Sequence, residues 1–231
     1  MKSYLKQEDT ISIVVIGSFD PSIFHPQWFI RHQLVHEEDL KPPFLELNVV
    51  HRQLSQFKSS WFALEVVDNR LLLNTSDMTR SEDLRDLACN IFNILTEITI
   101  TAIGLNRTSV YKCMTVNSWH KIGYTIAPKD IWLKSFPQAI TTPGGIGMKK
   151  ADIQLERWDD IPGHILISAF PSNYPPEQEV TLTLNDHISF AKLVENRKDI
   201  TFSSFLIEYW DDFYKNSEDG INNILKEIEN E

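Results

Sequence analysis

The sequence predicts an α+β fold in which antiparallel sheet is covered by helices on one face. Three observations lead to this class. Short segments rich in β-branched residues follow one another through tight turns, an amphipathic helix comes after them, and 42% of the 231 residues are hydrophobic. A doubly wound parallel sheet would need a helix between most strands, and hairpins dominate here instead.

Apolar runs mark the first strands, and proline or turn-forming residues separate these runs. Residues 11–17 form a β-branched run typical of a buried strand, and residues 44–50 indicate a second one. Between them, Pro26 stands where the first residue of a short helix belongs. Residues 61–67 and 71–75 then predict a hairpin, because the intervening Asp and Asn tolerate left-handed backbone.

The helix that follows is the clearest element of the sequence. Ser81 or Thr79 caps it, and Glu82 and Asp83 lie in its first turn, where they complement the helix dipole. Apolar residues then recur at helical spacing, namely Leu84, Leu87, Ala88, Ile91, Ile94 and Leu95. The pattern changes to a period of two at residues 97–105, which predicts another strand.

The second part of the chain repeats this outline. Short helices are predicted at 116–123 and 128–135, and strands at 151–157, 164–170 and 180–186. A helix capped by Thr201 or Ser203 follows, and Ser217 begins a last helix over 217–231. We therefore expect one domain over 1–231, with two possible halves (10–96 and 97–215) of four strands and a helix each.

Charge and cysteine content restrict the class of protein. Thirty-two acids and 22 bases give a net charge of −10, and residues 208–231 alone carry −6. This acidic end repels phosphate backbones, so nucleic acid is an unfavoured partner. Cys89 and Cys113 indicate a reducing compartment, and neither a signal peptide nor a membrane-length apolar run is visible. The expectation is a soluble, cytoplasmic protein.

Few residues suggest chemistry, and each has a plainer interpretation. His32 and His36 stand four residues apart, so on one helix face they could begin a metal site, although two solvated histidines are the more common outcome. Asp186 and His187, with a further acid, could serve a metal-dependent hydrolase or nuclease. No nucleophile elbow is present, and no cofactor is predicted.

A glycine-rich segment at 143–147, followed by Lys149 and Lys150, could cradle an anion with its backbone amides. A phosphate-binding loop lies between a strand and a helix, whereas these glycines lead toward a strand. We interpret the segment as a mobile loop.

The aromatic residues give the only binding signal. Trp28, Phe29, Trp158 and Trp210 lie beside charged or turn residues. Most aromatic side chains fill cores. If two of these four are exposed together, they mark a patch that binds a protein or peptide.

Several short motifs resemble one known family. These are Pro-Gln-Trp-Phe at 26–29, the hairpin at 61–75, Ala-Ile-Gly-Leu-Asn-Arg at 102–107, Trp-x-x-Ile-Gly at 119–123 and Ala-Pro-x-x-x-Trp at 127–132. Together they resemble an uncharacterised, sporadically distributed family of bacterial proteins, over about two thirds of the chain. The order of strands and helix is also similar to SecB-like chaperones. The resemblance implies a bacterial protein and assigns no catalytic residue.

Taken together, these patterns predict a non-catalytic protein-interaction module, adaptor or complex subunit of the bacterial cytosol. It would form a homo- or hetero-oligomer and could belong to a phage-defence or toxin-linked operon. The edges of an antiparallel sheet are available for pairing with a partner. The alternative is an enzyme whose Asp and His residues come from distant parts of the chain.

Overall fold

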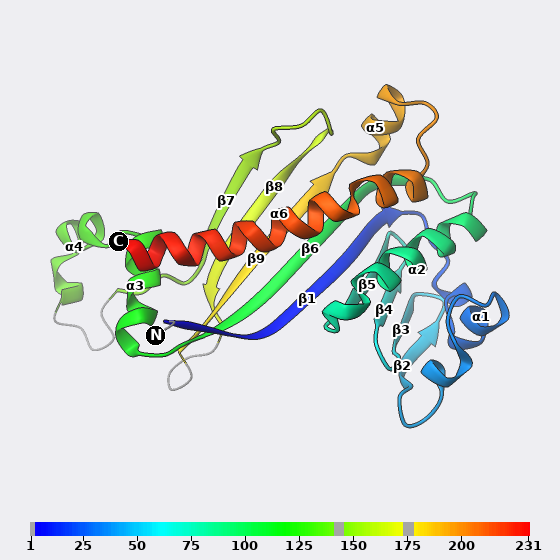
Figure 1. Cartoon of the computed structure of the whole chain (residues 1–231), viewed down its shortest axis with the longest axis horizontal. Helices are drawn as coiled ribbons and strands as arrows, with labels where there is room; N and C mark the ends of the chain where they lie inside the picture. Colours follow the sequence, from blue (N-terminus) through cyan, green and yellow to red (C-terminus); the bar gives the residue numbers. More distant parts are fainter. Residues whose placement is uncertain (1–2, 141–145, 173–177) are drawn as a thin grey trace.

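The computed structural model describes residues 3–140, 146–172 and 178–231, and within them the strands form one nine-stranded antiparallel sheet. The strand order is β2-β3-β4-β5-β1-β6-β9-β8-β7, so β2 and β7 are the two edges (Figure 1). The strands are β1 (Tyr4–Gly17), β2 (Glu46–His51), β3 (Leu54–Lys58), β4 (Ala63–Val67), β5 (Arg70–Thr75), β6 (Ile100–Cys113), β7 (Ala151–Glu156), β8 (Gly163–Pro171) and β9 (Glu179–Ile188). The predicted α+β class with antiparallel sheet is confirmed.

The helices are of very different lengths. The α-helices are α1 (Pro26–Arg31), α2 (Ser81–Ile94), α3 (Val116–Ile126), α4 (Asp130–Ser135), α5 (Phe190–Asn196) and α6 (Phe202–Asn230), and short 3-10 turns at Pro21–Ile23, Glu37–Leu40, Met78–Arg80 and Pro137–Ile140 connect some of them to the strands. In the described part of the chain, no helix combines the length and apolar content that a membrane crossing requires.

The two longest strands, β1 and β6, form the centre of the sheet and join its two halves. They pair from Tyr4 with Cys113 to Gly17 with Ile100, with a register shift near each end. The sequence predicted only the β-branched part of β1. The polar residues before Ile11 are also extended, because pairing with β6 satisfies their backbone groups.

The hairpin predicted at 61–75 is confirmed. Val67 pairs with Arg70 at its turn, and the register continues without a shift to Ala63 and Asn74. Alternate residues of β5, Leu71 and Leu73, are fully buried. This alternation fixes the register, since a slip of one residue would turn these leucines to the other face.

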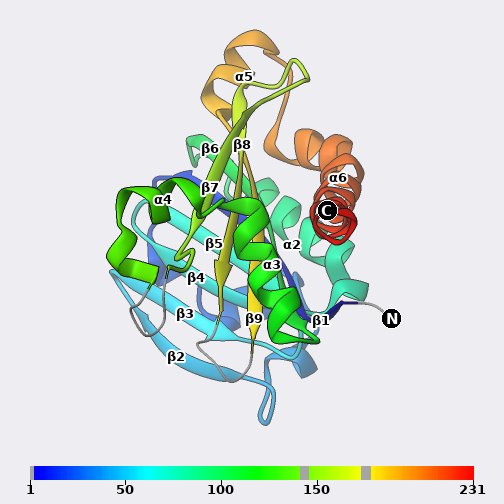
Figure 2. The same ribbon diagram turned by 90° about the vertical axis from the view of Figure 1, so that its left-hand side faces the viewer.

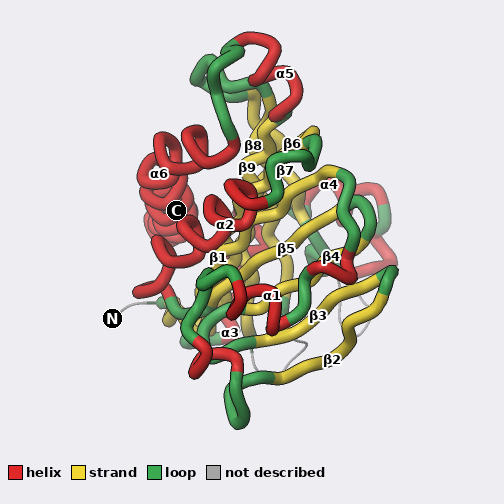
Figure 3. Tube along the Cα trace, turned by 90° about the vertical axis from the view of Figure 1, so that its right-hand side faces the viewer, coloured by secondary structure: helices red, strands yellow, loops and turns green. Residues whose placement is uncertain are grey.

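Helices α2 and α6 lie side by side on one face of the sheet (Figures 1 and 3). Their contact includes Phe92 and Phe202, whose ring centroids are 4.4 Å apart. Ser203 Oγ also donates a hydrogen bond to the Cys89 carbonyl oxygen at 3.2 Å. The predicted apolar stripe of α2 is confirmed at Leu84, Leu87, Ala88 and Ile91, which are buried, whereas Ile94 at the end of the helix is 37% exposed.

Helix α6 is one continuous helix of 29 residues, so the prediction that Ser217 begins a separate helix is wrong. Ser217 is fully buried, and its hydroxyl donates to the Tyr214 carbonyl oxygen of the preceding turn instead of capping a new helix. The cap predicted at Thr201 is confirmed: its hydroxyl accepts from the Ser204 amide at 3.1 Å. The acidic C-terminal segment therefore extends α6 along the sheet.

The two halves share an order of elements. A 14-residue strand comes first, short helices follow, then antiparallel strands, then a helix that covers the sheet. An internal duplication remains a prediction. The halves lie at a steep angle to each other because the sheet is twisted (Figure 2).

Candidate protein-binding surface

The four aromatic residues predicted to bind a partner do not gather on the surface. The side chains of Phe29 and Trp210 are 0% and 1% exposed, so the binding prediction is corrected at both positions. Trp28 is half-buried against the core, and only Trp158, at 68%, is largely exposed.

Local geometry explains why the two aromatic residues of α1 pack inward. Pro26 begins the helix, and His25 caps it by accepting from the Gln27 amide at 3.2 Å. The helix therefore presents Phe29 to β3 and the segment before β4. The Phe29 ring centroid lies 5.4 Å from that of Phe57 and 6.1 Å from that of Phe62.

Asp186, the acid of the enzyme alternative, belongs to a closed network of buried polar groups beneath α6. Its carboxylate accepts from the Tyr209 hydroxyl at 2.7 Å and forms a salt bridge with Arg157. Arg157 also bonds Asp159, with Nη2 2.7 Å from Oδ2. Burial raises the pKa of Asp186, against the opposite effects of the Tyr209 hydrogen bond and the Arg157 charge. This network holds α6 on the sheet.

A second network, which the sequence analysis missed, lies further along α6. Arg107 is 1% exposed, and its Nη2 lies 2.6 Å from Asp9 Oδ2. Ser109 donates to the same carboxylate at 2.7 Å, and Glu218 of α6 lies 3.3 Å from Arg107. Burial alone would raise the pKa of Asp9, but hydrogen bonds from Arg107, Lys6 and Ser109 outweigh it and lower that pKa.

His187 lies on the opposite face of the sheet from Asp186, since neighbouring residues of a strand alternate. The two therefore do not form the acid–base pair that the enzyme alternative needs. His187 pairs in register with His164, at 4.8 Å between ring centroids, and Glu156 pairs with His164 from the other side. Burial lowers the pKa of His187, and the neighbouring His164 adds to this effect.

His32 and His36 do not share a helix face. Helix α1 ends at Arg31, His32 is its C-cap with its ring centroid 4.9 Å from that of Trp28, and His36 precedes the turn at Glu37–Leu40. The metal alternative needed a helix that carries both residues, and both are exposed, as the solvated interpretation expects. No group of three or more His, Cys, Asp or Glu side chains suited to a metal occurs among the residues with described positions.

The glycine-rich segment falls partly outside the described residues, which exclude 143–145. Its end is described. Ile146, Gly147, Lys149 and Lys150 line a surface hollow that leads toward β7.

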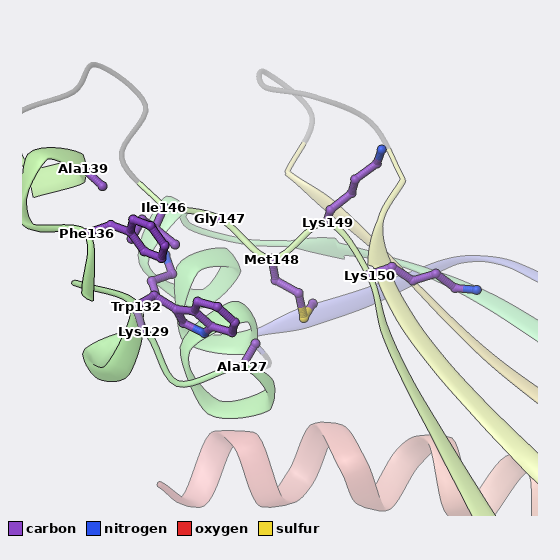
Figure 4. Close-up of a pocket in the computed structure, with 10 residues that line it drawn as sticks. All are labelled: Ala127, Lys129, Trp132, Phe136, Ala139, Ile146, Gly147, Met148, Lys149 and Lys150. Carbon is purple, nitrogen blue, oxygen red and sulfur yellow. The ribbon is translucent and has the colours of Figure 1, made fainter. Parts of the chain in front are cut away.

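This hollow, here called the α4 hollow, lies between α4 and the segment that leads into β7. It has a volume of about 480 Å³, and it is lined by Ala127, Lys129, Trp132, Phe136, Ala139, Ile146, Gly147, Met148, Lys149 and Lys150. Figure 4 shows the rings of Trp132 and Phe136 on one side of the hollow, with Met148 across from them. Lys149 and Lys150 belong to the segment that leads into β7 and form one rim, and in this view their ammonium groups point away from the two rings.

Large apolar side chains around the hollow remain in contact with solvent. Trp132 is 52% exposed, Phe136 58%, Ile131 67% and Tyr124 49%. Helix α4 has only six residues and buries none of them, so these side chains contribute little to a core. Exposed apolar side chains grouped in this way typically mark a surface that binds another molecule.

The charge around the hollow is opposite to that of the whole chain. Residues 98–150 contain seven bases and a single acid, Asp130, in a protein of net charge −10. Lys129 is 8% exposed, and its ammonium lies 4.0 Å from the centroid of the Tyr124 ring. Burial lowers the pKa of this lysine. The scarcity of acids over residues 98–150 is the sequence signal that could have located this surface.

Comparison with protein families and with curated proteins identifies no relative of this chain. No protein-family model matches the chain, and no curated protein matches it. The resemblance to a bacterial family and to SecB-like chaperones stays a prediction.

Proposed function

We propose that this chain is a non-catalytic protein-interaction module, acting as an adaptor or complex subunit in the bacterial cytoplasm. Its α4 hollow binds an acidic segment of another protein that also carries apolar side chains. A defence or toxin-linked operon is a fitting context for such a subunit.

The observation that carries this proposal is the exposure of Trp132 and Phe136 beside one hollow. Aromatic residues contribute most of the binding energy at many protein interfaces, because their large rings lose contact with water when the partner docks. The fold gives these two rings no other evident role, since α4 buries no residue.

The charge pattern supports an acidic partner. Lys129, Lys149 and Lys150 line the hollow, and a negatively charged segment would approach it more rapidly and with fewer wrong orientations. Lysines and exposed aromatic rings can also hold single-stranded nucleic acid. A phosphate backbone carries a negative charge on every nucleotide, so the net charge of −10 repels it more strongly than a protein segment with a few acids among apolar residues.

Two observations weaken the enzyme alternative. The Asp186 carboxylate is already occupied by Arg157 and Tyr209, and His187 points to the other face of the sheet. A catalytic acid or base must reach the atom it serves, and these two cannot reach a common one.

A direct test measures binding of a short fluorescent peptide that forms an amphipathic helix, with Asp and Glu on one face and Leu and Phe on the other. We expect saturable binding to the wild-type chain. The double variant Trp132→Ala/Phe136→Ala should weaken it at least ~30-fold, as for truncation of interface hot spots. Phe44→Ala is the matched control, because Phe44 is 54% exposed and does not line the hollow.

The competing probes are a peptide with Lys in place of the acids and an oligo-dT strand. Stronger binding of either than of the acidic peptide would contradict the proposal. Equal loss of binding in Phe44→Ala and in the double variant would also contradict it, because the peptide would then not bind specifically at the α4 hollow.

A further inference from the structure

The edge strand β7 is regular, and no strand within the described residues pairs with its outer side. All six of its residues pair with β8 without a register shift, and among the described elements none pairs with the other edge. The opposite edge strand, β2, has a register shift between Leu47 and Val49, and such irregularities protect an edge from further pairing. Within the described residues β7 has no such register shift, and its protection rests on charged side chains alone.

The side chains of β7 include an apolar residue that its own chain leaves exposed. Ile153 is 53% exposed and lies on the face that α6 covers elsewhere. Trp158, just beyond the strand, is 68% exposed. Exposed apolar side chains on a straight edge strand are typical of strands that pair with another chain.

We infer that β7 pairs antiparallel with β7 of a second copy of this chain, giving one continuous sheet across a two-fold axis centred on Ile153. The strand is complementary to itself in this register. Ile153 faces Ile153, and Ala151 faces Leu155. On the other face Lys150 lies opposite Glu156, twice by symmetry.

Neighbouring registers are less favourable. A shift by two residues in one direction places Asp152 opposite Asp152, and a shift in the other places it opposite Glu156. Like charges directly opposite each other destabilise a strand pair. The proposed register instead places Asp152 opposite Gln154, and it brings Trp158 close to the other copy's Lys149 and Lys150.

This inference does not rest on the acidic partner proposed for the α4 hollow, although Lys150 takes part in both. The interface is a single pair of six-residue strands with flanking side chains, so we expect a weak dimer at the small end of specific interfaces, below roughly 1,200 Å² of buried surface. The Trp132→Ala/Phe136→Ala variant should associate as the wild type does. The two proposals can therefore fail separately.

Sedimentation equilibrium of the full chain over a wide concentration range tests the inference. The wild type should approach twice its mass of 26.8 kDa. Lys150→Glu alone, or Glu156→Lys alone, should weaken self-association roughly 10-fold, because each places two pairs of like charges across the axis. An equimolar mixture of these two variants should restore the dimer, because residue 150 of each chain then lies opposite a residue 156 of the opposite charge.

Cross-linking reports the register itself. Ile153→Cys should form an inter-chain disulfide on mild oxidation, because the two residues lie opposite each other at disulfide distance. Gln154→Cys is the control and should cross-link far less, since its opposite residue is Asp152. Cys89 and Cys113 are buried and do not interfere.

A wild type that stays monomeric at every concentration would overturn the inference. So would a dimer that tolerates both charge reversals, or variants whose mixture stays monomeric. Folding defects do not imitate the expected result, because only intact strands can restore association when the two variants are mixed.

Discussion

The same residue types serve opposite purposes in the two insertions that follow the central strands. After β1, helix α1 places Phe29 against Phe57 and Phe62, where its side chain is fully buried. After β6, helix α4 leaves Trp132 and Phe136 more than half exposed. The first insertion closes the core, whereas in the second α3 buries Ile122 and α4 buries none of its residues, so that Trp132 and Phe136 remain exposed to solvent.

This difference shows that aromatic content alone does not distinguish a core from a binding surface. What separates the two insertions is the surface each one faces. Helix α1 lies over an apolar patch of β3 and β4, while α4 lies beyond the sheet, next to lysines. The comparison leads to the following expectations, from the largest effect to the smallest.

Phe29→Ala should cost about 3–5 kcal/mol of unfolding free energy, the usual range for removing a fully buried Phe side chain. Urea unfolding followed by circular dichroism measures this. Phe44→Ala, at a position 54% exposed, should change the free energy by less than about 0.5 kcal/mol. A loss below ~1 kcal/mol at Phe29 would mean that α1 is not part of the core.

Asp9→Asn should cost about 2 kcal/mol at neutral pH, because Arg107 loses its buried anionic partner. The pKa of Asp9 is lowered from its ordinary value of 3.8, so its contribution is present above that pH and is lost as the pH falls through the lower folded-state pKa. The stability gap between wild type and Asp9→Asn should therefore close below pH 3.8.

Unfolding curves of both proteins at several pH values provide the measurement. A gap that stays constant down to the lowest pH at which both fold would show that the charge of Asp9 is not what holds α6. Asp20→Asn is a suitable control, because Asp20 is a surface cap far from Arg107 in the sequence, and its carboxylate accepts hydrogen bonds from Ser22.

Trp132→Ala/Phe136→Ala should change stability by less than about 1 kcal/mol, in contrast to Phe29→Ala, since both rings are already largely solvated. The same urea experiment tests it. A destabilisation comparable to that of Phe29→Ala would place α4 in the folding core and remove the distinction between the two insertions.

Lys149→Glu should leave folding unchanged and weaken binding of the acidic peptide by a few-fold, with a smaller salt dependence, because it lies on the rim of the hollow. Titrations at low and high salt measure both quantities. Lys192→Glu, on α5, is the matched control and should bind as the wild type does. An unchanged affinity and salt dependence for Lys149→Glu would argue against electrostatic recognition.

Much of the fold could be predicted because it depends on local patterns. The stripe of α2, the Val67–Arg70 turn and the Thr201 cap each follow from residues close in sequence. The break predicted at Ser217 failed, because a serine hydroxyl can bond the preceding turn as readily as it caps a new one. Tertiary packing on the sheet keeps α6 continuous there.

The surfaces were harder to predict, because they depend on which residues the fold leaves uncovered. Trp210 and Trp132 look alike in sequence, yet Trp210 lies on the buried face of α6 and Trp132 lies exposed on α4. The buried pair Asp9–Arg107 joins residues 98 positions apart, so no local pattern reveals it. The one sequence signal for the proposed binding surface is its charge, because residues 98–150 contain almost no acids.

The most direct test of the central claim is the affinity of the acidic peptide for wild type, Trp132→Ala/Phe136→Ala and Phe44→Ala, each verified as folded by its circular dichroism spectrum. The account predicts that only the double variant loses binding, and that its unfolding free energy stays close to that of the wild type. Retained peptide affinity in the folded double variant would contradict the assignment of α4 as the partner-binding surface.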